Sequence, residues 1–109
     1  MTISFGSNKL IQGADMSASF QSDNINLHRK EEFAIHSIFT GSPVGSMYLA
    51  VSLDAVSWII LQDSTAAIAA AGDVMYNVNV AGYLWARLHY VATSGTGSLS
   101  AFFNAKGEI

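Results

Sequence analysis

The chain has 109 residues, which is enough for one hydrophobic core and too short for two, so we expect a single domain over residues 1–109. Cysteine is absent, and this excludes disulfides, thiolate metal sites and a cysteine nucleophile. The net charge is -3, with five basic and eight acidic residues, which argues against a phosphate-binding surface for nucleic acid.

The low content of charged residues bears on partners. Only 12% of the chain is charged and 50% is hydrophobic, whereas soluble domains usually carry about 25% charged residues. Either Ser, Thr, Asn, Gly and Ala make up most of the surface, or a partner covers part of it. Core-like interfaces are depleted in charge, so the composition favours a homo-oligomer over the first alternative.

The N-terminal residues 1–6 do not show a basic stretch followed by an apolar run, so we expect no signal peptide. The apolar segments are shorter than the roughly 20 residues of a membrane-spanning helix. The sequence therefore predicts a soluble protein that is made in the cytoplasm and does not insert into a membrane.

The first half of the chain predicts several strands. Residues 1–30 are irregular, with one or two short strands expected around Phe20, Ile25 and Leu27. Residues 33–40 are apolar on both faces, as in a strand that is central or covered on both sides. Residues 41–45 read Gly-Ser-Pro-Val-Gly and predict a turn. Residues 46–53 then alternate, with one apolar face and an opposite face that includes Tyr48. The apolar face consists of Met47, Leu49, Val51 and Leu53.

The second half continues in the same way. A short connection over residues 53–57 precedes a strand over 58–62 that is apolar on both faces. Residues 64–71 are rich in Ala but too short for a convincing helix, so we expect a strand or loop with at most one helical turn. Period-two alternation returns in residues 74–80, 84–92 and 98–105. The Ser-Gly-Thr-Gly segment at 94–97 predicts a tight hairpin between the last two strands.

Short strands at regular spacing, separated by turns, predict an all-β fold. We expect a single antiparallel β-sandwich, jelly-roll-like, with about seven to nine strands. An immunoglobulin-like strand order has the same local signals and stays open.

No catalytic template is present: the chain lacks HExxH, G-x-S-x-G, a P-loop and GxGxxG. The three histidines, His28, His36 and His89, have no ligand spacing for a metal, and His89 stands near Arg87, a poor neighbour for a cation. We therefore expect no enzyme activity, no catalytic residue, no metal site and no cofactor.

The aromatic residues suggest a contact surface. Trp85, Arg87 and His89 alternate with the apolar positions of their strand and so face away from the core. Trp and Arg are the residue types enriched in interface hot spots. We expect these three residues, with Tyr48, to form an interface or binding surface, and we expect Trp58 to pack in the core.

The middle and end of the chain hold five short motifs. They are Thr40-Gly41-Ser42-Pro43-Val44-Gly45, Ser52-x-Asp54-x-x-x-Trp58, Ala81-Gly82-Tyr83-x-Trp85-x-Arg87-Leu88-x-Tyr90, Thr93-Ser94-Gly95-Thr96-Gly97-x-Leu99 and Ala105-Lys106-Gly107. In this order, the motifs resemble those of small virion-associated proteins of tailed phages and prophages. Two of them, the S-x-D-x-x-x-W element and the W-A-R-L-H strand, also resemble discoidin-type, galactose-binding-like jelly rolls.

The resemblance implies a β-sandwich with a structural role in a phage or prophage particle, capsid-decorating or head-associated and located in the virion. It also implies a homo-oligomer, with a trimer favoured, and contact with a capsid or other virion protein. The discoidin-like motifs imply that Asp54 lies in a hairpin with Trp58 behind it. A carbohydrate-binding module that recognises a host surface is the alternative, for which exposed aromatic rings would serve as stacking platforms.

Overall fold

Two long strands form the centre of the fold, β4 (Glu32–Ser52) and β8 (Trp85–Lys106), which pair antiparallel along their whole length. The computed structural model describes residues 8–28, 30, 32–79 and 83–106, and within these ranges it contains eight strands and no helix. The other six strands are β1 (Asn8–Asp15), β2 (Phe20–Gln21), β3 (Ile25–Asn26), β5 (Ile59–Ile60), β6 (Ala66–Ile68) and β7 (Gly72–Asn79).

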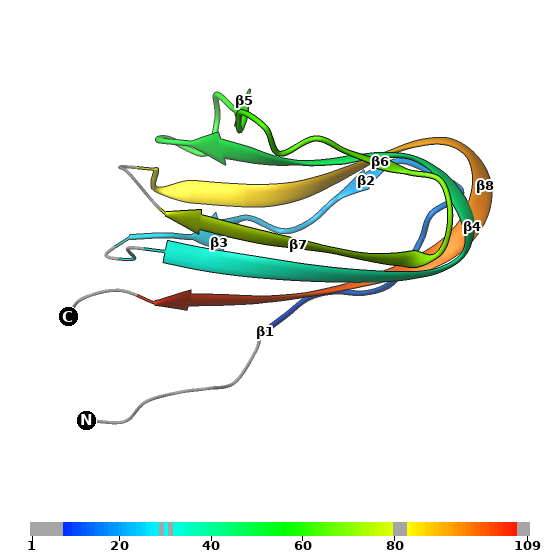
Figure 1. The fold of residues 1–109 in the computed structure, drawn as a ribbon. Helices are drawn as coiled ribbons and strands as arrows, with labels where there is room; N and C mark the ends of the chain where they lie inside the picture. The colour runs from blue at the N-terminus through cyan, green and yellow to red at the C-terminus, as the bar shows by residue number, and fades with distance from the viewer. Residues whose placement is uncertain (1–7, 29, 31, 80–82, 107–109) are drawn as a thin grey trace.

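The β4–β8 ribbon bends back on itself, so that its two halves belong to two stacked sheets (Figure 1). In the first sheet, β1 pairs with residues 98–103 of β8, and β7 pairs with residues 32–39 of β4. In the second sheet, β2 and β3 pair with the N-terminal half of β8, while β5 and β6 pair with the C-terminal half of β4.

Both long strands thus pass from one sheet to the other, which joins the two layers as in a jelly roll. The predicted all-β, antiparallel, jelly-roll-like sandwich of about seven to nine strands is confirmed, with eight strands in the described part of the chain.

The two segments predicted as turns, residues 41–45 and 94–97, are instead the bend of the ribbon. Each lies inside an uninterrupted strand, and they pair with each other: Gly41 lies opposite Gly97, and Pro43 opposite Gly95. Gly41 and Gly95 have positive φ angles of 86° and 80°. A Cβ atom on Gly95 would overlap the carbonyl oxygen of Ser42. The residue types that make a turn also allow a strand to bend sharply, and the prediction of two chain reversals was wrong.

The core lies between the two sheets. Across the bend, the alternation of buried positions shifts by one residue in β8 but not in β4. The core-cluster residues of β4 are odd-numbered on both sides of the bend, whereas those of β8 are even-numbered before it and odd-numbered after it. A register shift explains the difference, because Val44 pairs with Ser94 and Gly45 pairs with Ala92, which leaves Thr93 as a bulge. The buried core comprises Met16, Ile25, Leu27, Phe33, Ile35, Phe39, Met47, Leu49, Val51, Ile68, Ala86, Leu88, Tyr90, Leu99 and Ala101.

Other local predictions had mixed outcomes. Leu53, expected to face inward, follows the end of β4 and is 65% exposed. Ile59 and Ile60 form a two-residue edge strand and are 68% and 53% exposed, so the expected cover on both faces is absent there. The Ala-rich stretch contains β6 and no helix. β1 was not foreseen, and the predicted end of the 74–80 strand at Val80 lies outside the described residues.

Candidate functional site

The outer face of the second sheet holds the four residues predicted as a contact surface. Trp85, Arg87 and His89 are half-buried and alternate along β8 with Ala86, Leu88 and Tyr90, which are buried in the core. Tyr48 is half-buried as well, and it lies directly opposite His89 on the neighbouring strand β4. The alternation of β8 therefore brings the four predicted residues onto one face.

Two contacts fix the middle of this face. The rings of Tyr48 and His89 stack, with centroids 4.9 Å apart and planes 7° apart. Arg87 donates a hydrogen bond from Nε to Nε2 of His89 over 2.8 Å, so this ring nitrogen must be unprotonated. Burial, and then the positive charge of Arg87, lower the pKa of His89. Both effects keep the imidazole neutral and able to accept this bond.

Trp58 joins the same face, and the prediction that it packs in the core was wrong. It precedes the edge strand β5, is half-buried, and does not belong to the core cluster. The guanidinium carbon of Arg87 lies 4.0 Å from the centroid of the Trp58 ring, which is a close cation–π contact. At the start of β8, the ring of Trp85 contacts that of His28 edge-on, with centroids 5.5 Å apart.

We refer to Tyr48, Trp58, Trp85, Arg87 and His89 together as the aromatic face. Arg87 is its only formally charged member, and that charge is shared between a tryptophan ring and a neutral histidine. Side chains held by each other lose little freedom when a partner binds, so the face is suited to a protein contact. Sequence reasoning missed Trp58 because β5, the strand that follows it, is too short to show a period. Stacking of Arg on Trp is nevertheless a common pairing.

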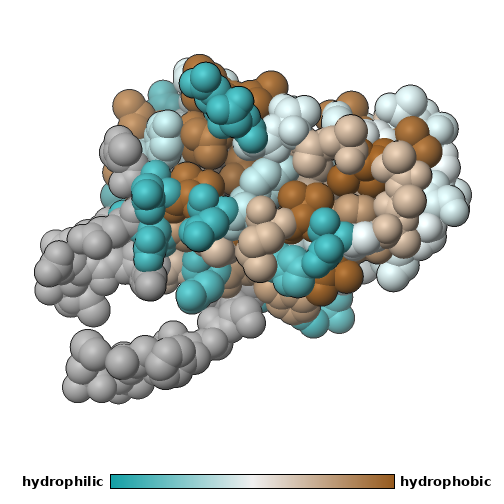
Figure 2. Space-filling model, viewed as in Figure 1, coloured by the Kyte–Doolittle hydropathy of each residue, from teal (hydrophilic) through white to brown (hydrophobic). Residues whose placement is uncertain are grey.

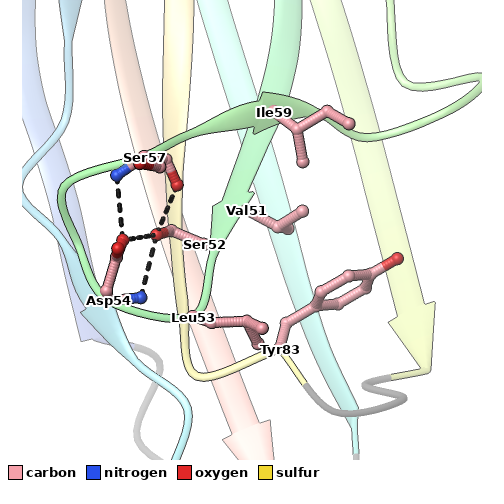
Figure 3. A pocket seen from close by; sticks show the side chains of 7 residues that line it. All are labelled: Val51, Ser52, Leu53, Asp54, Ser57, Ile59 and Tyr83. Carbon is pink, nitrogen blue, oxygen red and sulfur yellow. Dashed lines mark hydrogen bonds between the residues drawn. The ribbon is translucent and has the colours of Figure 1, made fainter.

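A pocket of about 540 Å³ lies at the open end of the sandwich, beside the loop that joins β4 to β5 (Figure 3). Ser52 and Asp54 line it, but the Ser52 hydroxyl and one Asp54 oxygen make hydrogen bonds within the loop. The Ser52 hydroxyl donates to the carbonyl of Ser57 over 2.7 Å, and one Asp54 oxygen accepts from the Val56 and Ser57 amides. These amides hold the pKa of Asp54 below its usual value. The remaining lining is mostly apolar, with Val51, Leu53, Ile59 and Tyr83.

Asp54 thus lies in a loop between two strands, as the discoidin-like motif implies. Trp58 departs from that pattern, because it stacks on Arg87 at the outer face.

The remaining polar groups are dispersed. On the first sheet, Nε2 of His36 lies 2.9 Å from an Asp73 carboxylate oxygen. Among the described residues, no group of three or more His, Asp or Glu side chains is placed to hold a metal ion. In the same part of the chain there is no helix long and apolar enough to cross a membrane.

Comparison with known proteins gives similarity in structure but not in sequence. No protein-family model matches the chain, and no curated protein matches it. The crystal structure of the SPBc2 prophage-derived protein YomS superposes with a TM-score of 0.61 and 9% identity, covering 95% of this chain and 99% of that one. The coat protein of Tobacco streak virus aligns over 100% of this chain and 92% of its own at 8% identity, with a TM-score of 0.44 that is too low to support an argument. At 9% identity the first similarity establishes a shared fold over nearly the whole of both chains.

Proposed function

We propose that this chain is a non-enzymatic structural protein of a phage or prophage particle, capsid-decorating or head-associated. It is made in the cytoplasm of the bacterial host and acts in the virion through homo-oligomerisation, as a trimer, and through contact with a shell protein. It uses no cofactor, no nucleic acid and no membrane. The shared fold with a prophage-derived protein supports a role in a phage or prophage particle.

The aromatic face is the observation that carries the proposal. It is a half-exposed surface of two tryptophans, a tyrosine, an arginine and a histidine, in which each side chain already contacts another part of the chain. Aromatic and Arg side chains dominate the energy of protein interfaces. Burying this face against a second protein would cost little additional conformational entropy.

Carbohydrate binding is the alternative use of the same rings. Sugar stacking needs a free ring face, and since His89 covers one face of Tyr48 and Arg87 covers one face of Trp58, each of these two rings has at most one face left for a sugar. The internal contacts therefore favour a protein partner over a glycan.

The experiment is co-fractionation of the protein with purified particles. Phage induced from the strain that carries the gene is banded in a density gradient, and the chain is quantified in the particle band. We expect the wild-type protein in that band and Trp85→Ala depleted from it, with folding checked by circular dichroism. Thr96→Ala, an exposed change at the bend, is the control. A wild-type protein absent from the band, or a signal on a glycan array, would contradict the proposal.

A further inference from the structure

The edge strands of the two sheets differ in how well they are protected against pairing with another strand. β2, β3 and β5 have two residues each and β6 has three, too short to template a partner. β1 is longer, but two register shifts interrupt its ladder. Short edge strands and bulges are the devices by which proteins avoid edge-to-edge association.

β7 has none of these devices. Its eight residues pair with β4 without a register shift, and it contains no Pro and no Lys. Within the described part of the chain, β4 is its only strand partner. Because alternate residues of an antiparallel edge strand direct both backbone groups outward, one side of β7 presents a regular row of free donors and acceptors.

The core is also open along β7. Its inward side chains, Val74, Tyr76 and Val78, are only half-buried, whereas Phe33 and Ile35 on the neighbouring strand are 1% and 0% exposed. A cavity of about 390 Å³ follows this flank between residues 61–64 of the other layer and residues 75–79. A strand added at this edge would cover apolar surface as well as satisfy backbone groups.

The outward side of β7 is nearly uncharged. Met75 is 61% exposed there, and the only charged residue of the strand is Asp73, which pairs with His36. If a second β7 pairs with the first about a two-fold axis at Met75 or Tyr76, Asp73 lies opposite Asn77 or Asn79. The two carboxylates therefore do not face each other, and β7 is complementary to itself.

We propose that β7 is a docking edge for β7 of a second copy of this chain, so that two first sheets join into one continuous antiparallel sheet. This inference rests on the homo-oligomer of the proposed function and adds a two-fold contact to it. The contact is isologous and so doubles the number of subunits: it gives a dimer alone, and a hexamer where a separate contact makes trimers. The aromatic face, on the other sheet, stays available for a shell protein.

The test combines solution mass with hydrogen exchange. Met75→Lys places two lysines close together at the two-fold axis, and Asn77→Lys adds a charge at the same edge. Both should halve the mass measured by light scattering. Asn104→Lys is the matched control, because Asn77 and Asn104 both lie opposite Ala34, on β7 and β8 respectively, and both are exposed. In the wild-type protein, alternate amides of β7 should become protected from exchange as the concentration rises.

The outcomes separate this inference from the proposed function. An oligomer whose mass both edge variants leave unchanged, and whose β7 amides exchange equally at low and high concentration, overturns the β7 contact alone. A monomer at every concentration overturns the β7 contact together with the homo-oligomer. Particle co-fractionation then still decides whether the chain belongs to the particle. If a lysine variant fails to fold, hydrogen exchange of the wild-type protein decides.

Discussion

At the scale of single residues, the aromatic face depends on the protonation state of His89. Its Nε2 accepts a hydrogen bond from Arg87, and the pKa of His89 is lowered by burial and by the Arg87 charge. The unfolded chain, in which a histidine titrates near pH 6.5, therefore binds a proton more readily than the folded protein. The stability that neutral His89 provides is complete above about pH 6.5 and is lost as the pH falls through its lowered pKa.

We expect the melting temperature of the wild-type protein to fall as the pH is lowered from 7.5 to 5. The melting temperature of His89→Gln should fall less over the same range. The pKa values of Asp15 and Asp54 are held low by hydrogen bonds. These carboxylates therefore affect stability only at more acidic pH, and not between pH 7.5 and 5. Thermal unfolding followed by circular dichroism at several pH values measures both slopes. Equal slopes in the two proteins would assign the effect to another group.

At the scale of the element, the bend of the β4–β8 ribbon depends on glycine. Gly95 combines a positive φ with a Cβ position already occupied by the Ser42 backbone, so that Gly95→Ala introduces both strain and overlap. We expect Gly95→Ala to lower the free energy of unfolding by about 1–3 kcal/mol. Gly72→Ala is the matched control, because its Cβ would meet only the Phe39 ring, at 3.8 Å, an ordinary contact distance. Chemical denaturation measures both, and equal stabilities would show that the bend does not require glycine.

The strands themselves could be predicted from the sequence to a large extent, but the bend could not. Alternation correctly predicted the faces of residues 46–52, 84–92 and 98–105, because one side of each segment lies on the core. Gly and Pro at 41–45 and 94–97 show where the backbone changes direction. They do not show whether the chain reverses within one sheet or passes into the next, since that depends on pairing between distant residues.

The candidate site, like the strands, could be predicted where it depends on alternation along one strand, but not where it depends on contacts between distant segments. Trp85, Arg87 and His89 share a face by alternation alone, which the sequence shows. The stacking of Trp58 on Arg87 and the contact of His28 with Trp85 depend on how distant segments meet β8, and such contacts leave no local pattern in the sequence.

At the scale of the whole molecule, the two sheets share their central strands and should unfold together. Trp58 and Trp85 lie on the second sheet, so tryptophan fluorescence reports on that sheet, whereas His36 lies on the first. We expect the denaturation midpoint from fluorescence to coincide with the midpoint from the NMR signal of His36. Midpoints that differ beyond error would show that one sheet unfolds while the other persists, contrary to the continuity of β4 and β8.

The bulge at Thr93 constrains how the length of β8 can change during evolution. Insertion or deletion of one residue in the bend of β8 exchanges the inward and outward side chains of an entire half-strand. Gain or loss of two residues preserves them. Homologous chains should therefore differ in length at this position by even steps, although it is a glycine-rich surface segment where length variation would otherwise be free.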